Sequence, residues 1–195
     1  MVSRDSIRIA LNYAALNGLL VTAADIRNVY LQALSSQKHC ITCGKEFGLE
    51  NVGKRELIRR ALYGGKTAGK DFRNHLRECM DHLNFRSCLA NPDVWMKSAM
   101  KSDGTLVQEF VLLYTDNVLV VSKNGEAILR EGISQYFELK EDSIGLPNIY
   151  LGGKLWLVEL ENGARAWSFS ASQYVQEAVC NVKGYLAKKE EKLPN

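Results

Sequence analysis

The chain has 195 residues, of which 46% are hydrophobic and 24% charged, proportions that exclude a disordered, collagenous or coiled-coil protein. No apolar run is long enough to cross a bilayer, and the N-terminus lacks the apolar core of a signal peptide. The five cysteines are an odd number, which is typical of free thiols in a reducing compartment. We therefore expect an intracellular, cytoplasmic protein with no membrane partner.

The net charge of +3 is unevenly distributed along the chain. Residues 1–98 carry 15 Lys and Arg against 9 Asp and Glu, whereas residues 99–195 carry 10 against 13. The excess is greatest in a basic segment containing Lys54, Arg55, Arg59, Arg60, Lys66, Lys70, Arg73 and Arg77. Such a cluster suits a nucleic-acid backbone, and a solvated arginine-rich surface is the alternative.

The first half of the chain predicts a helix, a short strand, an irregular region and a second helix. Apolar residues at helical spacing indicate a helix over 5–17, and the apolar run 19–24 predicts a buried strand ending at Asp25. We expect residues 26–67 to hold a short helix near 26–33 and strands near 38–42 and 56–62. The apolar stripe over 70–84 predicts an amphipathic helix.

The second half predicts two hairpins, each followed by a helix. Strands at 106–114 and 118–121 are separated only by Thr115, Asp116 and Asn117, and strands near 149–160 and 164–169 flank an Asn-Gly turn at 162–163. Amphipathic helices are expected over 125–136 and, after a capping box at Ser170 and Gln173, towards residue 187. Residues 1–187 are thus interpreted as one domain, followed by a charged tail at 188–195.

The order of these elements predicts the fold class and one juxtaposition of acidic residues. Strand, insertion, helix, strand, strand, helix and strand follow the α+β, ferredoxin-like split β-α-β pattern, with helices on one face of an antiparallel sheet. In that topology the first strand lies beside the third, so Asp25 would meet Asp116 at one edge of the sheet. Two close carboxylates repel each other unless a cation lies between them, and Mg²⁺ prefers such oxygen ligands. A helix cap for Asp25 and an ordinary turn residue for Asp116 are the alternatives.

Several short segments, in the same order along the chain, resemble motifs of copia-type retrotransposon reverse transcriptases. Residues 24–31 (ADIRNVYL) resemble motif A, and residues 45–50 (KEFGLE) resemble a Pro-x-Gly-Phe-Glu stretch. Residues 60–66 (RALYGGK) resemble an Ala-Leu-Tyr-Gly-Leu-Lys element, 91–95 (NPDVW) an Asp-Pro stretch and 114–117 (YTDN) a Tyr-x-Asp-Asp box. Residues 150–153 (YLGG) resemble a Phe-Leu-Gly element, and 172–175 (SQYV) a Gln-x-Tyr-Val element. The resemblance runs from about residue 7 to residue 187.

This resemblance implies a polymerase palm with part of the fingers at about 26–67. It implies RNA-directed DNA polymerisation by two-metal nucleotidyl transfer, with template-primer and deoxynucleotides as substrates and other parts of a retrotransposon polyprotein as partners. A virus-like particle or the nucleus would then be alternative locations. The implied catalytic residues are Asp25, Asp116 and Asn117; Asp25 and Asp116 would bind Mg²⁺ or Mn²⁺; and Tyr30, Lys66, Lys70, Arg73 and Tyr114 would contact nucleotide or nucleic acid.

Other interpretations remain open beside the polymerase. Asn117 stands where the family has a second aspartate, and the resemblance begins just before motif A, without the first finger strands. A truncated, catalytically inactive remnant that binds nucleic acid is therefore the alternative. An unrelated ferredoxin-like RNA-binding module would need a Lys/Arg-Gly-Phe/Tyr box, which is not present. Cys40 and Cys43 have zinc-like spacing, but no second Cys-x-x-Cys accompanies them.

Overall fold

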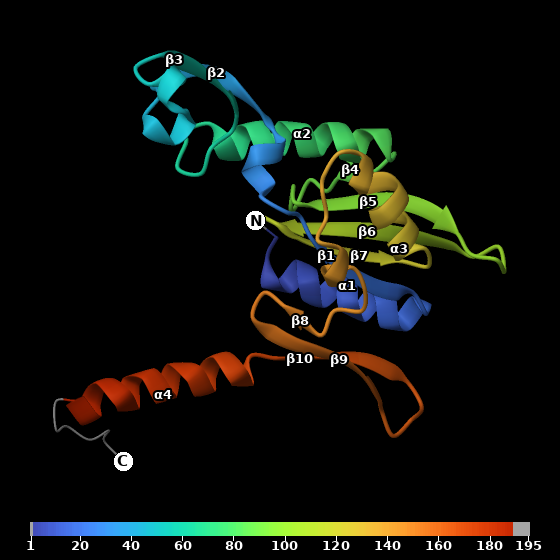
Figure 1. The fold of residues 1–195 in the computed structure, drawn as a ribbon. Coiled ribbons are helices and arrows are strands. Elements are labelled where there is room, and N and C mark those ends of the chain that lie inside the picture. Colours follow the sequence, from blue (N-terminus) through green and yellow to red (C-terminus); the bar gives the residue numbers. More distant parts are fainter. Residues whose placement is uncertain (1, 189–195) are drawn as a thin grey trace.

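A five-stranded antiparallel sheet forms the centre of the computed structural model, which describes residues 2–188 (Figure 1). Its strand order is β1-β7-β6-β5-β4, and every neighbouring pair is antiparallel. The α+β class expected from the sequence is confirmed. The strands are β1 (Leu20–Asp25), β4 (Arg86–Ser87), β5 (Val94–Met100), β6 (Leu106–Tyr114) and β7 (Asn117–Ser122).

The first face of the sheet is covered by α2 (Ala68–His82) and by the helical segment 125–135. Phe72, Leu76 and Met80 recur at helical spacing and pack in one cluster with the sheet residues Val111 and Val118. The predicted helix over 125–136 is wrong in detail. It divides into an α-helical turn, α3 (Gly125–Ala127), a π-helical turn (Ile128–Gly132) and a 3-10 turn (Ile133–Gln135).

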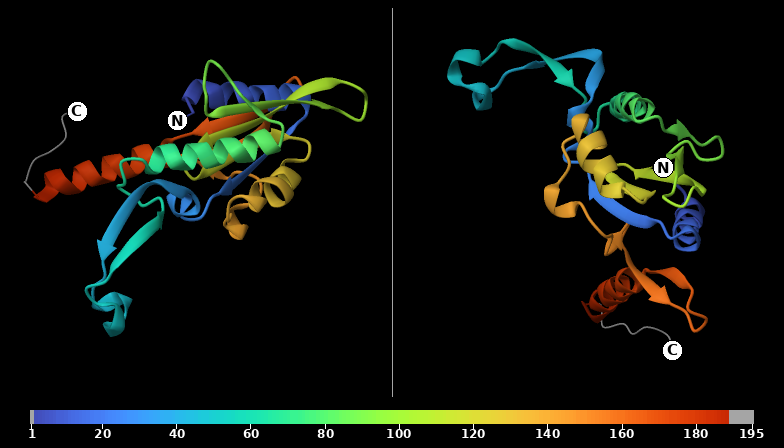
Figure 2. Two further views of the ribbon diagram at one scale, coloured as in Figure 1. Left: turned by 90° about the horizontal axis from the view of Figure 1, so that it is seen from above. Right: turned by 90° about the vertical axis from the view of Figure 1, so that its right-hand side faces the viewer.

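The opposite face is covered by α1 (Arg4–Asn17). Its buried residues Ile7 and Leu11 pack in a second cluster with Leu112 and Leu119, which alternate along β6 and β7 with residues of the first cluster. The expectation that the helices share one face is therefore wrong (Figure 2). An amphipathic pattern shows which side of a helix is apolar, but it does not show which face of a sheet that side covers. β7 is apolar on both faces, so it accepts helices on either.

The last predicted strands do not join the central sheet. β8 (Ile149–Tyr150), β9 (Gly153–Glu159) and β10 (Arg165–Ser170) form a separate three-stranded sheet that packs beside α1. The expected split β-α-β repeat is thus incomplete, because its fourth strand is not paired with β1. β5, which the sequence reading did not predict, instead extends the sheet on the far side of β6.

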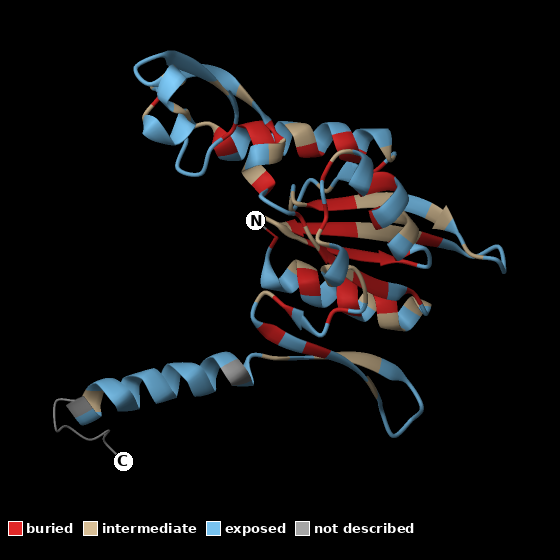
Figure 3. Ribbon diagram, in the orientation of Figure 1, coloured by how far each residue is buried: buried red, intermediate tan, exposed pale blue. Residues whose placement is uncertain are grey.

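Two elements project from this body (Figure 2). β2 (Leu34–Thr42) and β3 (Arg55–Arg60) form a two-stranded hairpin with short 3-10 turns at Lys45–Phe47 and Leu49–Asn51, and most of its side chains are exposed (Figure 3). The short helix predicted before it is only a 3-10 turn, Val29–Gln32. At the other end, α4 (Ser172–Lys188) extends away from the sheets and is also largely exposed.

The predicted charged tail lies outside the described residues, apart from Lys188 at the end of α4. Within the part of the chain that the structure describes, no helix combines the length and apolarity needed to cross a membrane.

Candidate active site

The pairing of β1 with β7 brings the predicted acidic residues to one end of the central sheet. Asp25 lies directly opposite Asn117 in the antiparallel register, and the backbone N–H of Ile26 donates to the carbonyl oxygen of Asp116 at 2.7 Å. Ninety-one positions separate Asp25 from Asp116 in the numbering, so strand order alone creates this proximity. The backbones of Asp25 and Asp116 therefore meet at one end of the sheet, as the topology predicts.

A two-residue turn positions Asp116 at the tip of the β6–β7 hairpin. Tyr114 pairs with Asn117, which leaves Thr115 and Asp116 as the turn residues. Thr115 has φ of +56°, a left-handed conformation that is unfavourable for a β-branched residue. Backbone strain of this kind is frequently found at functional sites.

The side chain of Asn117 is directed to its neighbour in the turn. Its amide Nδ2 donates to Asp116 Oδ1 at 3.0 Å. Asp25, Asp116 and Asn117 are all partly accessible to solvent. Carboxylate and amide oxygens are suitable ligands for Mg²⁺, so the chemistry of these three side chains fits such an ion. Among residues 2–188, however, no three His, Cys, Asp or Glu side chains are already arranged to hold a metal.

Lys140 is the closest basic partner of this site, and the sequence analysis did not identify it. Its Nζ lies 3.3 Å from Asp25 Oδ2, and its backbone N–H donates to the carbonyl oxygen of Asp25 at 2.9 Å. Lys140 belongs to a segment, residues 138–145, that runs along the free edge of β1 and that we call the strap. Nothing in the spacing of the sequence indicates this contact, because the strap has no periodic pattern and follows a helical segment.

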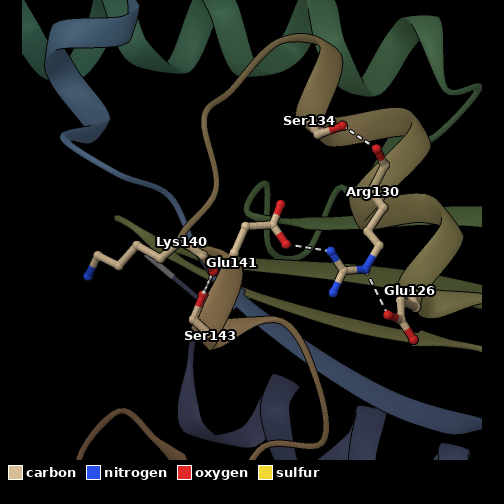
Figure 4. A network of polar contacts seen from close by, with 6 residues as sticks. All are labelled: Glu126, Arg130, Ser134, Lys140, Glu141 and Ser143. Carbon is tan, nitrogen blue, oxygen red and sulfur yellow. Dashed lines mark hydrogen bonds and ion pairs between the residues drawn. The ribbon is translucent and has the colours of Figure 1, made fainter.

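The strap is fixed to β1 and to the helical segment by further contacts. The backbone N–H of Asp25 donates to Ser143 Oγ at 2.8 Å, and Ser143 Oγ donates to the Lys140 carbonyl at 2.6 Å. Arg130, held by Glu126 at 2.7 Å, reaches Glu141 at 2.5 Å (Figure 4). The strap thereby occupies the edge at which the fourth strand was expected, and it covers backbone groups that would otherwise be open to another strand.

Tyr30 and Arg73 share a small cavity next to the hairpin turn. The cavity has a volume of about 140 Å³, and Thr115 and Leu113 also line it. The Tyr30 ring makes an edge-to-face contact with Phe72 at a centroid distance of 6.1 Å. Ligand pockets usually measure about 300–1,000 Å³, so this cavity accommodates only part of a nucleotide.

Arg73 does not present an unpaired charge to this cavity. Its guanidinium lies 3.2 Å from the carboxylate of Asp93, which also lines the cavity and whose side chain is mostly buried. Any anion that approaches Arg73 therefore meets a guanidinium already engaged with a carboxylate.

The other predicted nucleotide-binding residues are placed differently. Lys66 lines a larger cavity of about 690 Å³ between the β2–β3 hairpin and the start of α2. Tyr63 lines the same cavity and contacts the Tyr30 ring edge-on at 4.9 Å, which connects the two cavities through an aromatic pair. Lys70 is exposed in the first turn of α2. Tyr114 packs with the cluster that contains α1, whereas Tyr30 packs with the opposite cluster, so these two tyrosines are not brought together.

No protein-family model matches the sequence, and the search of curated proteins returned no match.

Proposed function

We propose that this chain is a reverse transcriptase-like nucleotidyltransferase domain of the copia type, with the palm site at the meeting point of β1 and the β6–β7 turn. The observation that carries the proposal is the register that sets Asp25 opposite Asn117 and next to Asp116. Asp25 and Asp116 would hold Mg²⁺ or Mn²⁺, and Asn117 would add a neutral oxygen. Bound divalent ions would supply the activation of the primer hydroxyl and the stabilisation of charge on the leaving pyrophosphate.

The chain's own residues would bind and orient the substrates around that ion. Tyr30, beside the hairpin turn, is suitably located to contact the sugar of an incoming deoxynucleotide. Lys66 and Lys70 would attract phosphate groups from the side of the β2–β3 hairpin, which carries much of the basic segment. Arg73 would have to exchange its contact with Asp93 for a phosphate, or else act through that pair.

With Asn117 in place of an aspartate, the site offers a divalent ion one negative charge fewer. An amide oxygen coordinates a hard cation more weakly than a carboxylate, because it carries no net charge. We therefore expect the chain to polymerise weakly and to gain activity when the acid is restored.

Primer extension on a homopolymer RNA template tests this proposal. The parent chain should extend the primer in Mg²⁺ or Mn²⁺, Asp116→Ala should not, and Asn117→Asp should extend it faster. Extension that is the same in the parent and in Asp116→Ala would contradict the proposed site. Glu131→Ala, which removes an exposed carboxylate of the helical segment 125–135, is the matched control and should leave extension unchanged.

A second candidate function is nucleic-acid binding without catalysis. It is favoured by the exposure of the β2–β3 hairpin, where basic side chains gather on a projecting element. If neither the parent nor Asn117→Asp extends a primer, while both bind the same template-primer in a salt-dependent manner, the second function replaces the first. Fluorescence anisotropy of labelled template-primer at several salt concentrations measures that binding.

A further inference from the structure

Asp25 already has a cation beside it, supplied by the chain itself. The Nζ of Lys140 lies 3.3 Å from Asp25 Oδ2, and the two residues are 115 positions apart. Among the described residues, Lys140 is the only basic side chain within ion-pair distance of either Asp25 or Asp116. Its ammonium group therefore supplies a counter-charge to the Asp25 carboxylate.

The backbone of the strap keeps Lys140 in this position. The strap is hydrogen-bonded on both sides of Lys140. The backbone of Gly145 exchanges hydrogen bonds with Ala23 in β1 at 2.7 and 3.1 Å, and the N–H of Arg27, just after β1, donates to the Glu138 carbonyl at 2.8 Å. Arg27 also forms an ion pair with the Glu138 carboxylate at 2.7 Å. Because these contacts hold the strap in place, the Lys140 side chain leaves Asp25 by rotating about its own side-chain bonds, and the strap itself does not move.

The exposure of the pair allows that rotation. The Lys140 side chain is 43% exposed and the Asp25 side chain 36% exposed, so the ammonium group can move into water without breaking a buried interaction. A lysine on a flexible four-carbon stem is a compact, mobile point charge, whereas a divalent ion can bridge several oxygens at once. The two cations would compete for the same carboxylate.

We propose that Lys140 is a built-in counter-ion of Asp25 that a divalent cation must displace, so that Lys140 lowers the metal affinity of this site. The inference rests on the proposed function, because it takes Asp25 as a metal ligand. Lys140 is thus a positioning residue that holds Asp25 in the absence of metal. Removing its charge should tighten binding of Mn²⁺ about two- to fivefold, the range expected when an exposed ion pair no longer competes.

Direct Mn²⁺ binding tests the proposal without any activity measurement. Electron paramagnetic resonance of free Mn²⁺ gives the dissociation constant for the parent chain and for four variants. Lys140→Met removes the charge, Lys140→Arg keeps it and Asp25→Asn removes the ligand. Lys123→Met, the control, removes a lysine just beyond the opposite end of β7. Circular dichroism establishes that each variant is folded, and Lys140→Gln replaces Lys140→Met if the latter does not fold.

The expected result is tighter Mn²⁺ binding by Lys140→Met alone, with Lys140→Arg and Lys123→Met like the parent and Asp25→Asn without binding. If the parent binds Mn²⁺ through Asp25 but Lys140→Met binds equally or more weakly, the counter-ion role is overturned and the proposed site survives. If neither the parent nor Lys140→Met binds Mn²⁺, the metal site of the proposed function is overturned, and the counter-ion role falls with it.

Discussion

Replacing Thr115 by glycine should stabilise the protein, although most substitutions to glycine in a hairpin do the opposite. Thr115 has φ of +56°, and a left-handed conformation costs an L-residue about 1–2 kcal/mol. Glycine adopts it without that cost but loses about 0.5–1 kcal/mol more conformational entropy on folding. We therefore expect Thr115→Gly to raise the free energy of unfolding by about 0.5–1 kcal/mol.

Urea denaturation, followed by circular dichroism, measures this change through the transition midpoint. Thr105→Gly is the matched control, because Thr105 lies in the connection between β5 and β6, is exposed and does not have a positive φ. It should lower the free energy of unfolding by about 0.5–1 kcal/mol, so the two substitutions should have opposite signs.

The same comparison can refute the proposed geometry. Equal destabilisation by Thr115→Gly and Thr105→Gly would mean that Thr115 is not left-handed, and the two-residue turn would then be wrong. A longer turn would shift β7 relative to β6, and a shift of one residue moves every side chain to the other face of the sheet. Tyr114 would then no longer pair with Asn117.

Two further predictions concern buried ionisable groups on α2. The buried Asp71 accepts hydrogen bonds from the hydroxyl and N–H groups of Ser36, and these bonds lower its pKa below the ordinary value of 3.8. The ionised carboxylate therefore stabilises the fold fully above pH 3.8, and this stabilisation is lost as the pH falls through the lowered pKa of the folded state. Acid denaturation should therefore show a shallower loss of stability below pH 3.8 for Asp71→Asn than for the parent, and an identical acid limb would contradict the Ser36 contact. Burial raises the pKa of Cys79 to about 12. A thiol reagent should therefore modify the exposed Cys40 and Cys180 in the native protein, and Cys79 only after unfolding, as measured by peptide mapping. Rapid labelling of Cys79 in the native protein would contradict the packing of α2.

Much of the local structure could be predicted from sequence, because short-range patterns determine it. The hairpin at 106–122 follows from two apolar runs separated by three polar residues, and the structure confirms it. The α2 stripe likewise predicts the residues that the structure buries, such as Phe72 and Leu76. The meeting of Asp25 with the hairpin turn could be inferred because a single topological choice, β1 beside β7, is sufficient to produce it.

The remaining features depend on long-range packing that no local pattern encodes. The face on which α1 packs depends on the second apolar face of β7, and the separation of β8–β10 from the central sheet depends on the strap at the edge of β1. Lys140 contacts Asp25 through an irregular segment, so neither helical nor strand periodicity could identify the pair. The strand Val94–Met100 was missed because its polar and apolar residues alternate only partly.

In the proposed site, Asp25 and Asp116 would bind a divalent cation together at the end of the sheet. Paramagnetic broadening of backbone amide resonances by Mn²⁺, added in small amounts to ¹⁵N-labelled protein, locates such an ion directly. The proposed site predicts that the resonances of residues around Asp25, Asp116 and Asn117, and of the strap near Lys140, broaden first, and that Asp25→Asn removes the effect. Broadening centred on another acidic pair, such as Glu126 and Glu141, or broadening that survives Asp25→Asn, would contradict the claim.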